Sequence, residues 1–124
     1  MDKGASCLEF YREKTIRIVR FKGESIGSGG YKSYSKGVAC LTYMYIEPSD
    51  EYDVQMIYEK LYSVLENDMI AAKFHTVFAL CDKAELPFYV RHGYTQGKER
   101  CKEKLARIMG AYVIHDLTVQ KKLV

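Results

Sequence analysis

The sequence predicts a single domain of the α/β or α+β class, built on a mixed β-sheet. The chain has 124 residues, enough for one hydrophobic core and too few for two. Hydrophobic residues make up 48% of it and charged residues 28%, as in ordinary globular proteins. Apolar residues recur with the period of a strand in some segments and with the period of a helix in others. Because a strand, a long helix and a second strand follow one another, we expect a right-handed crossover and parallel strands in the middle of the sheet.

The N-terminal part of the chain is rich in residues that favour strands. Two such runs, residues 7–11 and 15–21, are separated by the polar trio 12–14, and this pattern predicts a β-hairpin. Residues 38–46 are nearly all apolar or aromatic, which is typical of a central strand.

Between these strands lies a stretch dense in glycine and serine, KGESIGSGGYKSYSKG at 22–37. Its composition predicts a loop or irregular turn that holds at most a short edge strand. We interpret Gly27, Gly29 and Gly30 as turn residues.

A long amphipathic helix is predicted after Pro48, over residues 49–68. Ser49, Asp50 and Asp53 are residues that favour the N-terminus of a helix. The apolar residues that follow share one helical face: Val54, Ile57, Leu61, Val64 and Leu65.

A second strand and a short helix come next. Residues 74–81 are apolar and predict a buried strand, and residues 84–92 predict a helix with Pro87 tolerated in its first turn and Gly93 at its C-terminus.

The C-terminal part is expected to hold one more helix and one more strand. Residues 98–109 place their apolar side chains on one helical face, which Gly110 closes, and residues 111–119 predict a final strand.

Composition and spacing argue against several kinds of site. The four cysteines, at positions 7, 40, 81 and 101, form no Cys-x-x-Cys pair, which indicates a reduced compartment and no cysteine metal site. The histidines at 75, 92 and 115 are not three or four residues apart, as two metal ligands on one helix would be. We therefore expect no metal. The longest apolar runs are far shorter than the roughly 20 residues of a membrane-spanning helix, and we find no signal-peptide core. We therefore expect a cytoplasmic protein that does not enter a membrane.

The net charge of +3 is unevenly distributed along the chain. Residues 12–36 and 91–122 are basic, whereas 47–53 are acidic. Such a field favours an anionic ligand. Basic and aromatic residues are not clustered as in nucleic-acid-binding proteins, so a nucleic-acid partner stays open without support from the sequence.

The elements predicted over residues 38–94 end in the motif FYVRHGY, residues 88–94. This order and motif resemble the second half of the GCN5-related N-acetyltransferase (GNAT) superfamily, which writes the segment F-Y-x-x-x-G-F; Tyr94 replaces the last Phe. The spacing of CDKAELPFY (81–89) is similar to that of the glucosamine-6-phosphate acetyltransferase branch, and YVIHDLTVQKKL (112–123) is similar to the closing strand of several members. The resemblance implies a GNAT-like sheet that is splayed in its centre, with helices on both faces.

The resemblance also implies a chemistry, in which an amine attacks the thioester carbonyl of acetyl-CoA and the departing thiolate is protonated. By resemblance, Tyr89 is the proton donor. A phenol with a pKa of about 10 suits this task because the thiolate has a comparable basicity. The alternative is that Tyr89 is one of eleven tyrosines and lies half-buried against the sheet.

Further site residues follow from their positions in the family pattern. Tyr45, Ile46 and Glu47 occupy the place where a splayed strand offers backbone groups to the pantetheine arm of CoA. Glu47 and His75 are candidates for the base that takes a proton from the substrate ammonium. The alternatives are a solvated carboxylate for Glu47 and a hydrogen-bonded core histidine for His75.

The sequence departs from the family at the turn that holds the CoA pyrophosphate, Arg/Gln-x-x-Gly-x-Gly/Ala. Residues 51–56 read EYDVQM, so that Glu51 replaces the basic or amide residue and Val54 and Met56 replace the glycines. Asp50 and Asp53 add negative charge, which repels phosphates at a place where the backbone would otherwise attract them.

Two functions remain open. The first is a divergent N-acetyltransferase that acts on a small amine, such as an amino sugar phosphate, or on a protein amine, and that holds CoA with Lys32, Lys36 or Arg91. The second is a catalytically inactive GNAT-fold protein that binds a protein partner, for which ornithine decarboxylase antizyme is the precedent.

Overall fold

The computed structural model describes residues 7–97, 104, 107–108 and 117–124. The chain divides into two compact units. Unit 1 consists of Met1–Tyr31 and Tyr43–Asp68, and unit 2 of Lys32–Thr42 and Met69–Val124. The single domain expected from the sequence stays a prediction.

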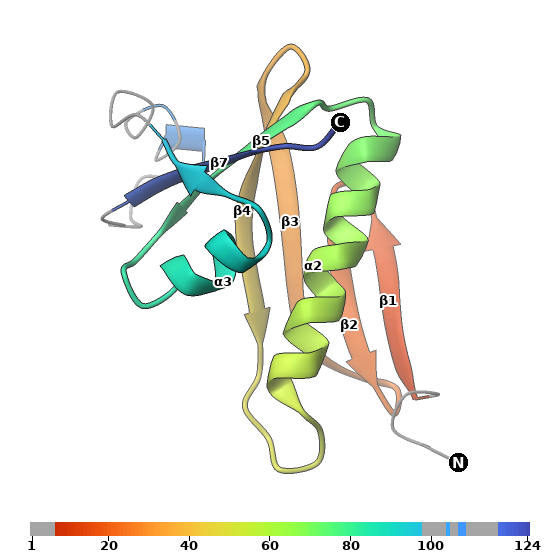
Figure 1. Cartoon of the computed structure of the whole chain (residues 1–124). Helices are drawn as coiled ribbons and strands as arrows, with labels where there is room; N and C mark the ends of the chain where they lie inside the picture. The colour runs from red at the N-terminus through yellow and green to blue at the C-terminus, as the bar shows by residue number, and fades with distance from the viewer. Residues whose placement is uncertain (1–6, 98–103, 105–106, 109–116) are drawn as a thin grey trace. The chain divides into compact units, whose positions relative to one another are not determined.

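The described residues form a mixed sheet of seven strands with the order β1-β2-β3-β4-β5-β7-β6 (Figure 1). Strands β4 and β5 are parallel, as predicted, whereas β1–β2, β2–β3, β5–β7 and β6–β7 are antiparallel. The elements are β1 (Leu8–Glu13), β2 (Ile16–Phe21), β3 (Glu24–Ser35), β4 (Val38–Ile46), α2 (Val54–Ala71), β5 (Thr76–Cys81), α3 (Leu86–Arg91), β6 (Thr95–Gln96) and β7 (Leu117–Lys122).

The predicted N-terminal hairpin and central strand are confirmed. The hairpin β1–β2 pairs from Leu8↔Phe21 to Glu13↔Ile16. Strand β4 has the predicted bounds, and Cys40 within it is fully buried.

The prediction of a loop over residues 22–37 is wrong, because 12 of these residues form β3, which lies between β2 and β4. The glycines in it are strand residues whose missing side chains make room for neighbours. A Cβ at Gly27 would collide with the carbonyl oxygen of Tyr45 in β4, and a Cβ at Gly29 would lie 2.9 Å from a methyl carbon of Leu65 in α2. Glycine in a strand marks such close approaches as well as turns, and the composition does not separate the two cases.

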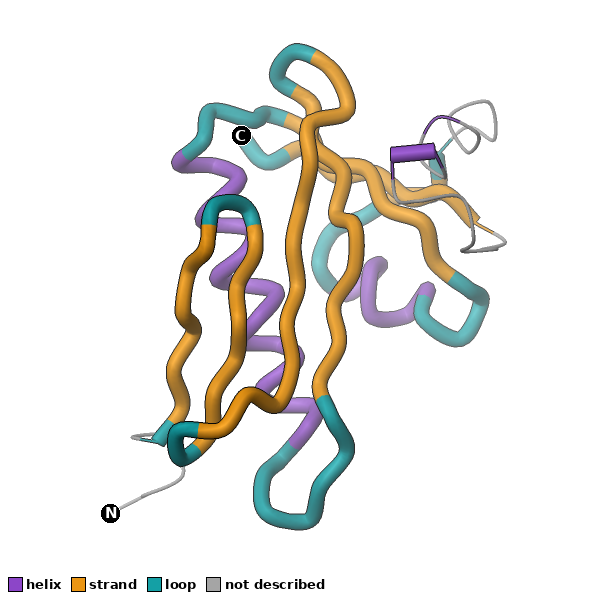
Figure 2. Tube along the Cα trace, turned by 180° about the vertical axis from the view of Figure 1, so that it is seen from behind, coloured by secondary structure: helices purple, strands orange, loops and turns teal. Residues whose placement is uncertain are grey.

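The long helix α2 packs its predicted apolar face against the strands of unit 1. The side chains of Ile57, Leu61 and Leu65 are fully buried. Asp53 caps the helix, since its carboxylate accepts a hydrogen bond from the backbone N–H of Met56 at 3.1 Å. The helix runs to Ala71, three residues beyond the predicted end. Seen from behind, strands β1 and β2 lie in front of this helix, which therefore covers one face of the unit 1 strands (Figure 2).

Unit 2 contains the parallel pairing of β4 with β5 and the antiparallel pairing of β5 with β7. The predicted strand at 74–81 is confirmed over Thr76–Cys81. Strand β7 begins at Leu117 and continues to Lys122, so the final strand extends three residues past its predicted end. The predicted start of that strand, residues 111–116, lies outside the described residues, as does most of the predicted helix 98–109.

The short helix α3 is confirmed and carries the aromatic motif. Pro87 stands in its first turn, and Gly93 follows the helix with a φ of +91°, a value that glycine adopts without strain. Tyr89 is the buried residue of the helix, at 5% exposure.

Candidate functional site

The parallel pairing between β4 and β5 is short. It runs from Val38↔Thr76 to Leu41↔Ala79, whereas β4 continues to Ile46. The second half of β4 therefore has no ladder partner in β5 within the described strands. This register agrees with the expectation of a sheet that opens in its centre.

The backbone at the end of β4 is directed by its other neighbour, β3. The N–H of Glu47 donates to the carbonyl of Ile26 at 2.7 Å, and the carbonyl of Tyr45 faces Gly27. Because successive residues of a strand direct their backbone groups to opposite sides, the N–H and C=O of Ile46 point away from β3. Of the three residues expected to contact CoA through their backbone, Ile46 is thus the best placed.

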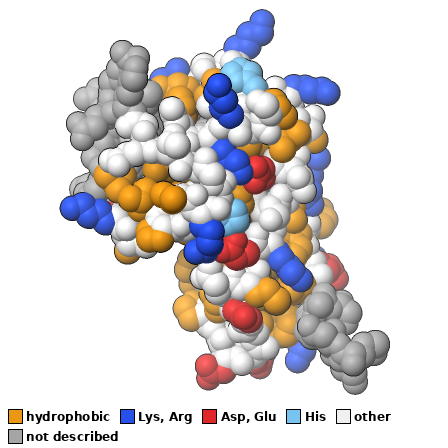
Figure 3. Space-filling model, in the orientation of Figure 1, with side chains coloured by type: hydrophobic (Ala, Val, Ile, Leu, Met, Phe, Trp, Pro, Cys, Tyr) orange, Lys and Arg blue, Asp and Glu red, His pale blue; other side chains and the backbone are white. Residues whose placement is uncertain are grey.

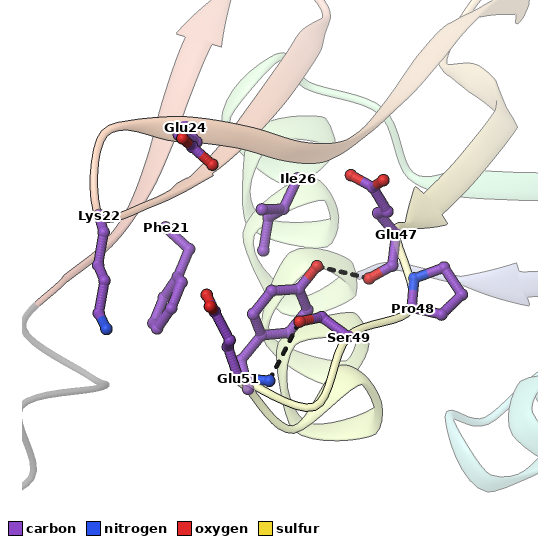
Figure 4. Close-up of a pocket in the computed structure, with 9 residues that line it drawn as sticks. Phe21, Lys22, Glu24, Ile26, Glu47, Pro48, Ser49 and Glu51 are labelled. Carbon is purple, nitrogen blue, oxygen red and sulfur yellow. Dashed lines mark hydrogen bonds between the residues drawn. The ribbon is translucent and has the colours of Figure 1, made fainter.

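The segment after β4 forms a pocket of about 440 Å³ in unit 1 (Figure 4). We call it the acidic pocket, because Glu24, Glu47 and Glu51 line it together with the rings of Phe21 and Tyr52. Figure 3 shows acidic side chains around the part of unit 1 where β4 leads into α2. In Figure 4 the carboxylate of Glu51 is directed toward the space beside Phe21 and Ile26.

Hydrogen bonds fix the loop that forms this pocket. The Tyr52 hydroxyl donates to the carbonyl of Glu47, and the N–H of Glu51 donates to Oγ of Ser49 at 3.1 Å. Burial raises the pKa of the Tyr52 phenol, and the nearby carboxylates of Glu47 and Glu51 raise it further. The potential in the pocket is therefore negative, which agrees with the charge that the sequence places at the start of the long helix.

Sequence reasoning missed the four residues that β2, β3 and the turn between them contribute to the acidic pocket: Phe21, Lys22, Glu24 and Ile26. They come from the end of β2, the turn and the start of β3, and the loop interpretation of residues 22–37 hid the hairpin that brings them to the β4–α2 loop. The available signal was Lys22-Gly23 between two β-rich stretches, since Gly23 has a φ of +82° in a tight turn.

Tyr89, the candidate proton donor, lies in unit 2 against other aromatic rings. Its ring makes edge contacts with Tyr94, at 5.1 Å between centroids, and with Phe88, at 5.4 Å. The side chain is more buried than the half-buried position of the alternative, at 5% exposure, and a packing role for this tyrosine stays open beside that of proton donor. The rings around it fix its orientation, as a positioned acid requires.

His75, a candidate base, is exposed and is not the core histidine of the alternative interpretation. It precedes β5, its Nδ1 lies 2.8 Å from Oγ1 of Thr76, and its backbone N–H donates to the carbonyl of Gly37. His75 directly precedes Thr76, which forms the first β4–β5 pair with Val38. It therefore lies at the start of the paired stretch, whereas the pairing stops at the other end, after Leu41↔Ala79. Glu47 comes after the other end of β4 and is exposed.

The three cations expected to hold phosphates are separate, exposed side chains of unit 2. Lys32 donates from Nζ to the carbonyl of Ile108 at 3.3 Å, and the guanidinium of Arg91 lies 5.6 Å from the ring centroid of Phe88. Lys36 lies in the turn between β3 and β4.

Lys36 and His75 come together in a second pocket, of about 540 Å³, within unit 2. We call it the basic pocket, because Lys36, Lys73 and His75 line it, with Gly37 and Phe74 beside them. Figure 3 shows Lys and Arg side chains around the β3–β4 turn and the start of β5. Of the sequence-predicted site residues, the structure thus brings together Lys36 and His75 in unit 2. In unit 1, Tyr45 and Ile46 end β4 and Glu47 directly follows it.

Two further findings concern the described residues alone. No group of three or more His, Cys, Asp or Glu side chains among them could hold a metal ion. None of the helices that the structure describes has the length and apolar character needed to cross a membrane.

Solved structures share this fold. N-acetylglutamate synthase from Neisseria gonorrhoeae, solved with coenzyme A and N-acetyl-glutamate, matches 97% of the chain with a TM-score of 0.70 and 13% identity, and the chain covers 30% of that protein. A GNAT-family acetyltransferase from Staphylococcus aureus Mu50 matches 88% of the chain, with a TM-score of 0.69 and 12% identity, over 68% of its own length. Tetrahymena GCN5 matches 90% of the chain, with a TM-score of 0.60 and 12% identity, over 71% of its own length.

At these identities the likeness shows the fold, which is that of the GNAT acetyltransferases. No family model matches the sequence. No curated protein matches it either.

Proposed function

We propose that this chain is a divergent GNAT-type N-acetyltransferase that transfers the acetyl group of acetyl-CoA to a primary amine. The observation that carries the proposal is the fold, which matches acetyltransferases over 97% of the chain in one case and 90% in another. The β4–β5 ladder that stops after Leu41↔Ala79 supports it, because it leaves backbone groups of β4 available to a substrate. The acceptor is a small amine or a protein amine.

In this proposal the backbone of Ile46 orients the pantetheine arm, and the amine attacks the thioester carbonyl directly. As the carbon–sulfur bond breaks, the Tyr89 hydroxyl gives its proton to the sulfur. The transfer is close to isoenergetic because the phenol and the thiol have comparable pKa values. Glu47 is the candidate base that takes a proton from the ammonium form of the substrate, so that the neutral amine can attack, and His75 is the second candidate.

The acidic pocket does not suit a pyrophosphate, because Glu47 and Glu51 line it beside the loop that leads into α2, where the family places the phosphates. A phosphate placed about 5 Å from one carboxylate at an effective dielectric of about 20 loses about 3 kcal/mol. In this proposal the phosphates of CoA are therefore bound by Lys32, Lys36 or Arg91, which lie in unit 2.

The test is an acetyl-transfer assay with a panel of primary amines, combined with calorimetric titration of acetyl-CoA. We expect Tyr89→Phe to lower kcat at least about tenfold and to leave the Kd of acetyl-CoA unchanged, since a positioned general acid contributes about 10²–10⁴-fold. Tyr94→Phe is the matched control, because it removes the hydroxyl of the neighbouring buried tyrosine. Equal activity in wild type, Tyr89→Phe and Tyr94→Phe contradicts the role of Tyr89.

The second candidate function is that of an inactive GNAT-fold protein that binds a protein partner, of the antizyme kind. The acidic pocket favours it, because carboxylates stand where a pyrophosphate would be bound. Thermal unfolding separates the two functions: acetyl-CoA at 100 times its Kd raises the stability by about 2.7 kcal/mol. The binding protein shows no such shift at millimolar acetyl-CoA.

A further inference from the structure

One face of the strands in unit 1 carries large apolar side chains that are exposed. Among the described residues seven such side chains are exposed, and four of them belong to this face, with exposures between 39% and 56%: Tyr11, Ile16, Tyr43 and Tyr45. We call it the tyrosine face. An exposed apolar patch of this kind marks a surface that meets another molecule.

The tyrosine face is the one turned away from α2. On the other face, Arg17 of β2 binds Asp68 of the helix, and Val19 is fully buried. Because successive residues of a strand alternate between the two faces, Ile16, Ile18 and Arg20 point away from the helix. Seen from behind, the strands of unit 1 lie in front of α2, and no helix among the described residues lies in front of them (Figure 2). A strand face in contact with water is normally polar, and this one is not.

The side chains of the tyrosine face form one continuous surface. The guanidinium of Arg20 in β2 lies 5.2 Å from the ring centroid of Tyr11 in β1. Farther along β2, Ile16 and the ring of Tyr43 from β4 meet over Gly30 of β3. A Cβ at Gly30 would lie 3.1 Å from Cγ1 of Ile16 and 3.6 Å from Cε1 of Tyr43. Side chains from β1, β2 and β4 therefore cover the face without a gap at the glycine.

The charged groups of the tyrosine face have both signs. In the β1–β2 register Glu9 lies opposite Arg20 and Glu13 opposite Ile16, so both carboxylates share the face. Neither of them forms an ion pair with another described residue. Tyrosine hydroxyls donate hydrogen bonds to carboxylates, and a guanidinium pairs with a carboxylate or stacks on an aromatic ring. A second copy of the same face thus supplies a partner for each of these groups.

The same charges disfavour an anionic partner. A nucleic acid or an anionic lipid surface is held mainly by basic side chains that neutralise phosphates. Here two carboxylates, of Glu9 and Glu13, stand on the face with the single guanidinium of Arg20.

The size of the tyrosine face fits a weak dimer. Four strands about 4.8 Å apart, with about six residues each at about 3.3 Å per residue, span roughly 19 Å by 20 Å. Two such faces bury on the order of 1,000 Å² once the relief of the side chains is included, which is the lower limit for a specific interface. We therefore expect a dimer that dissociates on dilution, with a Kd in the micromolar range.

From these observations we propose that the tyrosine face is the interface of a homodimer, in which the unit 1 sheets of two copies of this chain pack face to face. Two-fold symmetry makes every contact occur twice, so each tyrosine ring and each Arg20 is used by both copies. Two sheets packed in this way lie about 10 Å apart, with their tyrosine side chains between them. The proposal does not depend on acetyl transfer.

The first test is sedimentation velocity of the whole chain from about 5 to about 500 μM, a range that includes a micromolar Kd. We expect the monomer to be replaced by a dimer as the concentration rises. In ¹H–¹⁵N NMR spectra of the wild type over the same range, the amide signals of Tyr11, Ile18 and Tyr43 are expected to move, whereas those of Ile57 and Leu61 in α2 stay in place. A monomer at every concentration overturns the proposal and leaves the face to a different partner. Concentration-dependent signals confined to other surfaces overturn it as well.

Substitutions on the tyrosine face make the test specific. Tyr11→Ser and Tyr43→Ser are each expected to raise the Kd of the dimer at least about tenfold, because each removes one ring from both copies. Met56→Ser is the matched control, since Met56 is an exposed apolar residue of α2 in the same unit. A dimer that the tyrosine variants leave unchanged, or that Met56→Ser weakens equally, overturns the proposal.

Exchange of the charges tests why the partner is a second copy. Arg20→Glu leaves only carboxylates on the face, so we expect the Kd of the dimer to rise at least about tenfold. The exchanged variant Glu9→Arg/Arg20→Glu carries both signs again and is expected to recover most of the affinity. Equal Kd values for wild type, Arg20→Glu and the exchanged variant overturn the charge complementarity on which the choice of a second copy rests. Acetyltransferase activity enters none of these readouts, so failure here and failure of the proposed function are separate results.

Discussion

The acidic pocket of unit 1 and the basic pocket of unit 2 have similar volumes, about 440 and 540 Å³, and opposite charges. Glu24, Glu47 and Glu51 line the first, and Lys36, Lys73 and His75 line the second. In the GNAT acetyltransferases that the sequence resembles, the start of the long helix attracts phosphate groups. Here the carboxylates at that place repel them, and the positive charge lies in another part of the chain. The comparison of the two pockets predicts that a phosphate group binds in unit 2 and not at the start of α2.

The two units also differ in what holds them together. In unit 1, strands and helix approach closely at glycines, and the guanidinium of Arg17 binds the carboxylate of Asp68 with two contacts of 2.7 Å. In unit 2, the buried side chains of Cys40 and Leu80 pack against Phe78 and Tyr34. Predictions that disturb one unit and spare the other test this comparison.

The largest effect is expected for Gly27→Ala in unit 1. The added methyl group collides with the backbone carbonyl of Tyr45, so β3 and β4 must move apart, and we expect a loss of about 3 kcal/mol of unfolding free energy. Urea unfolding at neutral pH measures it. Gly97→Ala in unit 2 is the control, because its nearest contact would be an ordinary 3.4 Å to Cγ2 of Thr118. Similar unfolding free energies for the two variants would contradict the close packing assigned to Gly27.

The next effect is expected for Arg17→Met. Asp68 is buried, at 8% exposure, and without Arg17 its carboxylate loses the partner that binds both of its oxygens. We expect the free energy of unfolding to fall by about 2 kcal/mol. This is less than for a fully buried pair, because the Arg17 side chain is 20% exposed. The double variant Arg17→Met/Asp68→Leu is expected to recover most of it, since no charge then remains buried. A single variant as stable as wild type in urea would show that the pair contributes nothing.

These two predictions also show which parts of the structure the sequence could reveal. The helix face with Ile57, Leu61 and Leu65 was predictable because its apolar period is long and regular. Strand β3 was not predictable, because Gly27 and Gly29 are needed where β4 and α2 approach the strand too closely for a side chain. The residues that make these contacts are distant in the sequence. Local composition therefore indicated a loop where tertiary packing requires a strand.

The candidate site was predictable to a similar, partial extent. The charge reversal at Glu51 could be seen directly, since it departs from a short motif. The pocket around it could not, because Phe21 and Glu24 reach it only through the hairpin formed by β2 and β3. Which residue acts as proton donor or base is a matter of distances to a substrate, and for Tyr89, Glu47 and His75 it stays a prediction.

A smaller effect is expected in unit 2 at alkaline pH. Burial raises the pKa of the Cys81 thiol from 9.0 to about 11, with smaller contributions from Glu85 and Asp82. Between these values the folded state holds a proton that the unfolded state has lost, so stability is complete below pH 9 and falls as the pH rises toward 11. We expect a loss of about 1 kcal/mol between pH 9 and pH 10, measured by urea unfolding.

The Cys81→Ala variant is expected to remove most of this pH dependence, because alanine does not titrate. Cys7→Ala, which changes a half-buried thiol in unit 1, is expected to leave it unchanged. If the stability of the Cys81→Ala variant falls as steeply as that of wild type over this range, the thiol is not its source.

The smallest effect concerns the charge of the basic pocket. If this unit holds the phosphates of CoA, Lys36→Gln is expected to weaken CoA binding about threefold at 50 mM NaCl, since an exposed charge contributes up to about 1 kcal/mol. The difference between wild type and variant is expected to shrink at 300 mM NaCl, because salt screens exposed charges. Calorimetric titration measures both, and Lys60→Gln on the exposed side of α2 in unit 1 is the matched control. Equal CoA affinities for the Lys36 and Lys60 variants would separate the basic pocket from CoA binding, and the opposite charges of the two pockets would then need a different explanation from a displaced phosphate site.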